Sequence, residues 1–273
     1  MAKKIQVGFI GGGNMAEALI RGLLQGKTLS ASQCRVHDVL QDRLAYLKKT
    51  YGVQTASTPG PAVEPSQVVI LAVKPQQIPK ALKALIPLWS PEKLLVSIAA
   101  GITLDQLAKP FPSPPRLVRV MPNTPALIKA GISALCRNDA VREDDFQLAE
   151  SLFKAVGETV RLDESLFDAV TGLSGSGPAY VFVILEALSD AGVKVGLPRP
   201  VASKLALETV YGASRLARES DLTFGQLKDM VTSPGGTTIA GLHEMEKAGL
   251  RGILMNAVEA ATRRSRELRE QLP

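Results

Sequence analysis

The chain has 273 residues, of which 45% are hydrophobic and 21% are charged, and its formal net charge is +6. This length exceeds what one compact core usually holds, so we expect two domains, and the composition excludes a disordered chain. Lys and Arg are spread along the sequence and only 4% of the residues are aromatic, which argues against nucleic-acid binding.

The cysteine content and the hydropathy pattern indicate the compartment. Cys34 and Cys136 lack the spacing of a disulfide framework or a zinc site, and no cleavable signal organisation precedes the first strand. No apolar run reaches the roughly 20 residues of a membrane span. We therefore expect a cytoplasmic protein that uses no metal and does not act on a membrane.

The first half of the chain alternates short β-branched runs with helical segments. Strands are predicted over residues 5–10, 34–38, 68–73, 94–100 and 116–122. Helices are predicted between them, over residues 14–24, 42–50 and 77–89. The strands scarcely alternate between apolar and polar residues, so both of their faces should be buried. The fold class expected is α/β, with a Rossmann-type, doubly wound parallel sheet.

Strand signals stop near residue 163, and the rest of the chain has helical spacing. Residues 1–163 are therefore predicted to form the Rossmann domain and residues 164–273 an all-helical domain. Apolar groups lie on nearly every side of the segment 178–188, so other helices should enclose it, either from this chain or from a second subunit. The arginine-rich segment 262–271, TRRSRELREQ, is expected to form a solvated helix face.

A glycine-rich turn joins the first predicted strand to the first predicted helix. Gly11, Gly13 and Ala16 keep the GxGxxA spacing of a dinucleotide site. Gly11 allows a tight turn, Gly13 lets the backbone approach a pyrophosphate, and Ala16 permits close packing of helix on strand. A purely structural turn is the alternative, but the flanking strand and helix favour binding.

The end of the second predicted strand bears on the choice of cofactor. Asp38 stands where an acid accepts a ribose 2′-hydroxyl and repels a 2′-phosphate, which favours NADH. Arg35 and Arg43 flank it and fit the phosphate of NADPH instead. Asp38 also fits a cap on the next helix, so both cofactors stay open.

Two further loops follow strands of the expected sheet, at the edge where such sheets bind their ligands. Lys74, in LAVKP, is suited to a phosphate or ribose oxygen, or it caps the strand. Asn123 and Thr124, in VMPNTPA, offer amide and hydroxyl groups to the same crevice, and a structural turn is an equal alternative there.

The sequence offers no strong base for oxidation of an alcohol. His37 lies on the second predicted strand, and His243 lies more than one turn into a helix. The segment TGLSGSGPAYVF does not keep the GxSxG spacing of a serine hydrolase, because the fifth residue counted from Gly172 is Ser176. Reduction of a protonated C=N bond needs no such base, since the proton stays on nitrogen.

The segment SPGGTT, residues 233–238, predicts a turn of exposed N–H groups at a helix N-terminus, where an anion binds. A substrate carboxylate held there, with a threonine hydroxyl near the imine nitrogen, fits an imine reductase.

Seven stretches together resemble the pyrroline-5-carboxylate reductase family. They are VGFIGGGNMAEAL, LAVKPQ, VSIAAGITLDQL, RVMPNTPA, TGLSGSGPAYVF, GLPR and LKDMVTSPGGTTIAGL, and they span essentially the whole chain. The resemblance implies reduction of L-1-pyrroline-5-carboxylate to L-proline by NADPH or NADH. It also implies that the helical domain binds substrate and interlocks into a homodimer, and it allows dimers to associate into a homodecamer.

The resemblance also implies roles for individual residues. Ser233, Gly236, Thr237 and Thr238 would hold the substrate carboxylate, and Thr238 would be catalytic at the imine nitrogen. Many relatives have Ser or Thr near the position of Asp38, so this residue leaves the preference between NADPH and NADH open. The residues predicted to contact the cofactor are Ile10, Gly11, Gly12, Gly13, Asn14, Met15, Asp38, Ala72, Val73, Lys74, Pro75, Ala99, Ala100, Gly101 and Asn123.

Other classes of protein compete with this interpretation. A related β-hydroxyacid dehydrogenase would need a Lys about two helical turns after the glycine turn, and SGSGPAYVFVILEAL contains none. Another imine reductase and a catalytically dead NAD(P)-binding scaffold are the remaining alternatives, and the intact threonine-rich loop argues against the scaffold.

Overall fold

A computed structural model describes residues 5–271, which form two compact units. The first unit extends to Gly175 and also includes the stretch from Ala260 onward, and the second is Ser176–Glu259. Both units thus differ from the domains proposed from the sequence. A boundary between residues 163 and 164 stays a proposal, because it marks the end of the strand–helix alternation.

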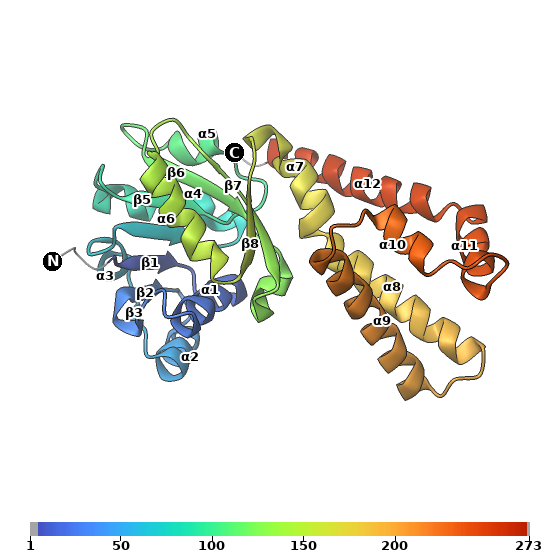
Figure 1. Ribbon diagram of the computed structural model, residues 1–273. Coiled ribbons are helices and arrows are strands. Elements are labelled where there is room, and N and C mark those ends of the chain that lie inside the picture. The colour runs from blue at the N-terminus through green and yellow to red at the C-terminus, as the bar shows by residue number, and fades with distance from the viewer. Residues whose placement is uncertain (1–4, 272–273) are drawn as a thin grey trace. The chain divides into compact units, whose positions relative to one another are not determined.

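The first unit contains the sheet and the helices that cover it (Figure 1). Its strands are β1 (Val7–Ile10), β2 (Cys34–His37), β3 (Gln54–Ala56), β4 (Val68–Leu71), β5 (Leu94–Ser97), β6 (Arg116–Met121), β7 (Gly131–Arg137) and β8 (Gly157–Arg161). Its α-helices are α1 (Asn14–Gln25), α2 (Gln41–Tyr51), α3 (Gly60–Val63), α4 (Ile78–Leu85), α5 (Leu104–Ala108), α6 (Glu143–Lys154) and α7 (Phe167–Val170). Short 3₁₀ turns are η1 (Ala31–Gln33), η2 (Pro75–Gln77), η3 (Ile86–Leu88), η4 (Thr124–Ile128) and η5 (Glu164–Leu166), and η6 (Thr171–Gly175) is a π-helical turn.

Within residues 5–271, the eight strands form one sheet in the order β3-β2-β1-β4-β5-β6-β7-β8. Strands β1 to β6 are parallel, which confirms the Rossmann-type α/β prediction for this part. The sheet departs from parallel pairing only at its far edge, where β7 is antiparallel to β6 and β8 follows the direction of β7. The connection from β6 to β7 contains only η4, which is too short for the crossover of a parallel neighbour.

Each face of the sheet has its own hydrophobic core. One face packs against α1, α2 and α6, through fully buried side chains such as Leu19, Leu47 and Phe153. The other face packs against α3, α4 and α5, where Val63 and Leu85 are fully buried. Because helices cover both faces, the central strands are apolar on both sides, as their sequences predicted.

A close approach of two backbones fixes the edge pair β7 and β8. Gly157 has φ +148°, and a Cβ on it would lie 1.9 Å from the carbonyl oxygen of Gly131 on the neighbouring strand. Only glycine fits at this position without opening the pair.

The second unit is helical. It contains α8 (Gly177–Lys194), α9 (Arg199–Glu219), α10 (Phe224–Met230), α11 (Thr237–Lys247) and the first part of α12 (Leu250–Gln271). Helices α8 and α9 pack on each other, with Ala202 and Ala206 buried. Large apolar side chains of α8 remain exposed in this unit, among them Phe182 at 65% and Val183 at 64%. The described helices of this chain therefore do not enclose α8, and its enclosure by helices of a second subunit stays a prediction. No helix within residues 5–271 is long and apolar enough to span a membrane.

Candidate functional site

The turn between β1 and α1 is built for close approach of a ligand. Gly11 has φ +98°, its N–H donates to the carbonyl of His37 at 2.8 Å, and a Cβ there would lie 2.6 Å from the carbonyl oxygen of Ala72. Gly13 is the N-cap of α1, no side chain caps the helix, and no atom lies within 4 Å of where its Cβ would be. The first N–H groups of α1 are therefore placed to receive an anion.

Asp38, just after β2, is tied to this turn. Its Oδ2 accepts the N–H of Gly12 at 2.7 Å, and its Oδ1 accepts the N–H of Leu40 at 2.9 Å. Asp38 and Gly11 line one cavity, together with Val73 and with residues of α4, including Lys80. The structure thus brings together Gly11, which follows the first predicted strand, and Asp38, which ends the second.

The neighbouring strands β4 and β5 add the loops predicted for the cofactor crevice. The N–H of Ala72 donates to the carbonyl of Ile10 at 2.8 Å, which places 72–75 beside the glycine turn. Gly101, after β5, has φ +75°, and Lys74 is exposed. Since β1, β4 and β5 are adjacent and parallel, their carboxyl ends meet at one edge. The individual roles assigned to these residues stay predictions.

Asn123 has structural partners on both ends of its amide. Its Nδ2 donates to the carbonyl of Ser174 at 3.2 Å, and its Oδ1 accepts the N–H of Ile132 at 2.9 Å. It therefore ties the loop after β6 to the π-helical turn η6 and to the start of β7. These contacts fit the structural alternative for this loop, and contact of Asn123 with the cofactor stays a prediction.

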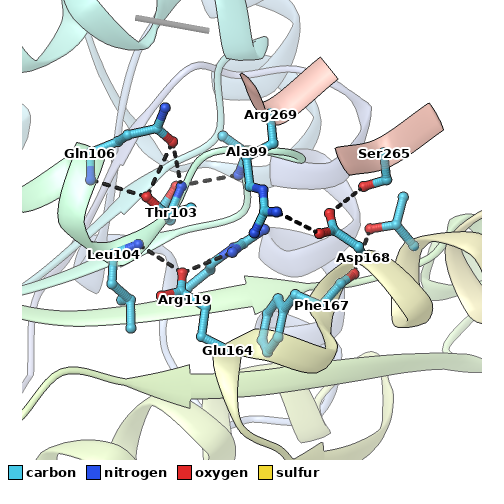
Figure 2. A network of polar contacts seen from close by, with 12 residues as sticks. Ala99, Thr103, Leu104, Gln106, Arg119, Glu164, Phe167, Asp168, Ser265 and Arg269 are labelled. Carbon is cyan, nitrogen blue, oxygen red and sulfur yellow. Dashed lines mark hydrogen bonds and ion pairs between the residues drawn. The ribbon is translucent and has the colours of Figure 1, made fainter. Parts of the chain in front are cut away.

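The sequence analysis did not find a polar network that joins β6, η5, α7 and the end of α12 (Figure 2). Arg119, in the middle of β6, is 3% exposed, pairs with Glu164 at 2.8 Å and lies 4.7 Å above the ring of Phe167. The sequence carried one signal for it, because an arginine within the apolar run RLVRVM must find a partner when the strand is buried.

The same network reaches the end of α12. Asp168, 4% exposed, accepts a hydrogen bond from the buried hydroxyl of Ser265 at 2.8 Å and pairs with Arg269 at 3.4 Å. The segment 262–271 is therefore only partly the solvated face that its arginines predicted. Glu164 is thus paired with β6 and Asp168 with the end of α12, as Figure 2 shows.

The predicted substrate loop lies in the second unit, between α10 and α11. Gly235 has φ +67°, and the N–H of Gly236 donates to the carbonyl of Ser233 at 3.1 Å. Gly236 is the N-cap of α11, and no side chain caps this helix. Thr238 is half-buried at the second helical position. A residue at this position can also serve only as a helix cap, but Gly236, and not Thr238, is the N-cap of α11.

The remaining reactive groups lie outside these loops. His37 contacts the carbonyl of Ala56 through Nδ1 at 3.1 Å, and His243 lies in the middle of α11. Cys34 and Cys136 are free, and burial raises the pKa of each thiol to about 12. Among residues 5–271, no three His, Cys, Asp or Glu side chains are grouped as a metal site would need.

The fold and the glycine turn are typical of a dinucleotide-binding protein, here with a helical second unit, and the comparisons make it an oxidoreductase. A family model described as "NADP oxidoreductase coenzyme F420-dependent" matches residues 6–101, and the model "Pyrroline-5-carboxylate reductase dimerisation" matches residues 164–268. The latter indicates a homo-oligomer.

Full-length relatives identify the family. The chain is 47% identical to the pyrroline-5-carboxylate reductase of a Synechocystis strain, over 97% of this chain and 98% of the relative. It is also 47% identical to the Arabidopsis thaliana enzyme of that name, over 98% and 96% of the two chains. The chain belongs to the pyrroline-5-carboxylate reductase family.

Solved structures agree with this assignment. A pyrroline-5-carboxylate reductase from Coxiella burnetii superposes with a TM-score of 0.93 at 37% identity and covers 97% of this chain and 99% of its own. The Plasmodium falciparum pyrroline carboxylate reductase with NADP bound gives a TM-score of 0.86 at 33% identity, covering 97% and 98%.

Proposed function

We propose that this chain reduces L-1-pyrroline-5-carboxylate to L-proline with NAD(P)H, the last step of proline biosynthesis. Similarity over nearly the full length supports the reaction. The observation that carries the mechanism is the uncapped N-terminus of α11, which follows the glycine turn 235–236 and has Thr238 in its first turn.

The residues at the edge of the sheet fit a nicotinamide dinucleotide. A Cβ at Gly11 would collide with the carbonyl of Ala72, whereas the space beside Gly13 is open, as close approach of a pyrophosphate requires. The N–H groups of Gly13, Asn14 and Met15 would hold the pyrophosphate, with 72–75 and 99–101 lining the crevice. When bound, the cofactor supplies the hydride.

The substrate carboxylate is held by the turn before α11. N–H groups of Thr237 and Thr238 carry the partial positive charge of the helix N-terminus, and the hydroxyl of Ser233 adds a donor. Gly236 shapes the turn at the carboxylate, since its own N–H donates to the carbonyl of Ser233. Held by its carboxylate, the ring presents its C=N carbon in one orientation, which removes much of the entropic cost of reaction.

The proton needed for reduction is already on the substrate. A protonated imine is an electrophile, and its N–H remains in the amine product, so the chain needs no strong base. The Thr238 oxygen accepts the N–H of the protonated imine and fixes the position of the proton, and its hydroxyl can donate to the nitrogen once the amine product has a lone pair. This role explains why neither His37 nor His243 needs to lie at the reacting atoms.

The helical second unit forms the dimer. The exposed apolar side chains of α8, including Phe182 and Val183, are suited to burial against a second copy. We propose an interlocked homodimer, with a homodecamer as the further assembly. Two free, buried cysteines are typical of a reducing compartment, and we propose the cytoplasm.

Cofactor oxidation with a panel of substrates tests the proposed reaction. The purified chain should oxidise NADH or NADPH when given pyrroline-5-carboxylate, and not when given 2-oxo or 3-hydroxy acids. Activity confined to the oxo or hydroxy acids would refute the assignment and favour the dehydrogenase alternative. A chain that binds cofactor but oxidises it with none of these would be the inactive scaffold.

Thr238→Ala tests the catalytic residue. Loss of one positioned hydrogen-bonding hydroxyl should lower kcat by about 10- to 1000-fold, with little change in cofactor affinity. Thr238→Ser keeps the hydroxyl and should recover most of the rate. An unchanged kcat in Thr238→Ala would remove Thr238 from the mechanism.

A further inference from the structure

The carboxylate of Asp38 is fixed in place with acceptor capacity to spare. Its two oxygens accept one N–H each, from Gly12 at 2.7 Å and from Leu40 at 2.9 Å. An ionised carboxylate has about four acceptor positions, so each oxygen keeps one free. Asp38 lines the same cavity as Gly11. It is therefore placed to accept both the 2′- and the 3′-hydroxyl of an adenosine ribose.

The arginines that could receive a 2′-phosphate are already engaged. Arg43 donates through Nε to the carbonyl of Gly12, pairs with Glu17 and lies 5.1 Å above the ring of Tyr46. Although burial raises the pKa of Glu17, hydrogen bonds from Tyr51, Arg43 and Tyr46 lower it overall, so Glu17 is ionised and balances Arg43.

The two other cationic side chains near the cavity, Arg35 and Lys80, are poorly placed to bind a 2′-phosphate next to Asp38. Arg35 donates to the side-chain amide of Gln54 on the neighbouring strand β3. Lys80 lines the same cavity from α4, where it is exposed, and it is the residue that would have to compensate a phosphate charge.

From this arrangement we infer that the chain selects NADH over NADPH and that Asp38 determines the preference. The inference rests on the proposed function and specifies its cofactor. A 2′-phosphate carries a charge of about −1.5 to −2 at pH 7. Placed a few ångströms from the Asp38 carboxylate, it would be repelled enough to weaken binding by about tenfold or more, and two hydroxyl hydrogen bonds would be reduced to one.

Direct binding measurements test the preference without turnover. NADH and NADPH are titrated against the purified full chain by nicotinamide fluorescence, with no pyrroline-5-carboxylate present. The wild type should bind NADH at least about tenfold more tightly than NADPH. Asp38→Ser should bring the ratio of the two dissociation constants close to one or invert it. Asp38→Asn removes the charge with little change in shape and should shift the ratio in the same direction.

Two control variants separate Asp38 from its surroundings. Asp42→Ser removes the same charge at an exposed position in the first turn of α2, and it should leave the ratio unchanged. Lys80→Ala should weaken NADPH binding little. A large loss of NADPH affinity in Lys80→Ala would place the phosphate at Lys80 and overturn the inference.

The ratio of the NADH and NADPH dissociation constants of the wild type tests the inference even if a variant fails to fold. NADPH binding that equals or exceeds NADH binding overturns the inference, as does a ratio that Asp38→Asn leaves unchanged. If NADH binds more tightly but neither cofactor is oxidised with pyrroline-5-carboxylate, the proposed function fails and the preference stands.

Discussion

Replacing Arg269 by methionine should loosen the end of α12 from the rest of the first unit. Arg269 pairs with Asp168 at 3.4 Å, and at an effective dielectric constant of about 20 the gross attraction is about 5 kcal/mol. Much of this is offset by desolvation, and Arg269 is still 32% exposed. The substitution leaves the Asp168 carboxylate, 5% exposed, with the Ser265 hydroxyl as its remaining partner in this cluster.

Breaking a fully buried pair costs about 3–5 kcal/mol, and the exposure of Arg269 places this pair lower, at about 2 kcal/mol. Asp168→Asn should cost less, about 1 kcal/mol, because an amide still bonds to Ser265 and the freed guanidinium can be hydrated. Arg269→Met should therefore cost more than Asp168→Asn, because the first leaves the buried Asp168 carboxylate unpaired and the second leaves the more exposed guanidinium.

Urea unfolding at pH 7 and one fixed protein concentration measures both free energies, and hydrogen exchange of residues 260–271 shows whether the loss is local. Arg266→Met, at an exposed position on the same helix, is the matched control and should stay within about 0.5 kcal/mol of wild type. The reasoning fails if Arg269→Met costs no more than its control, or less than Asp168→Asn.

Two further predictions concern the edge of the sheet. Gly157→Ala should destabilise the first unit by about 3 kcal/mol or more, because its Cβ would meet the backbone of Gly131 at 1.9 Å and the φ of +148° is strained for alanine; thermal unfolding measures the loss. Gly252→Ala, within α12 and with no atom within 4 Å of the new Cβ, should be neutral or stabilising, and equal effects of the two substitutions would contradict the packing argument. Glu150→Gln should cost about 1 kcal/mol at pH 7, because hydrogen bonds from Arg161 lower the pKa of Glu150 to about 2 and solvent screens part of the pairing. The folded pKa lies below the ordinary value of 4.5, so this stabilisation is present above pH 4.5 and is lost as the pH falls towards 2; a difference in unfolding free energy that stays constant from pH 7 to pH 2.5 would contradict it.

Most of the strands that the sequence predicted are buried on both faces. Strands β1, β4, β5 and β6 are mainly apolar, and this pattern can be recognised in the sequence alone. Strand β2 has a weaker pattern, because its buried and half-buried residues alternate. Strands β3 and β8 are mostly exposed or half-buried, so their sequences carry little apolar signal. The reversal of β7 depends on the short loop that precedes it, and periodicity within a strand does not encode direction.

The glycine turn and the loop before α11 could be predicted because their chemistry is local. Glycines at fixed spacing before a helix predict a tight turn with positive φ angles, and Gly11 and Gly235 have such angles. The pairing of Asp168 with Ser265 could not be predicted, because it joins residues that are 97 positions apart in the chain. Nothing in the arginine-rich sequence near Ser265 distinguishes a docked turn from a solvated one.

Residues from Ala260 onward complete a unit whose other residues end at Gly175, so the order of synthesis matters for folding. The ribosome releases the sheet early, but Ser265 and Arg269 emerge only after all of the second unit has been made. Until then the nascent chain carries Asp168 without these partners. The first unit is therefore complete only when the end of α12 has been synthesised. A chain truncated before Ser265 would leave the Asp168 carboxylate without these two partners.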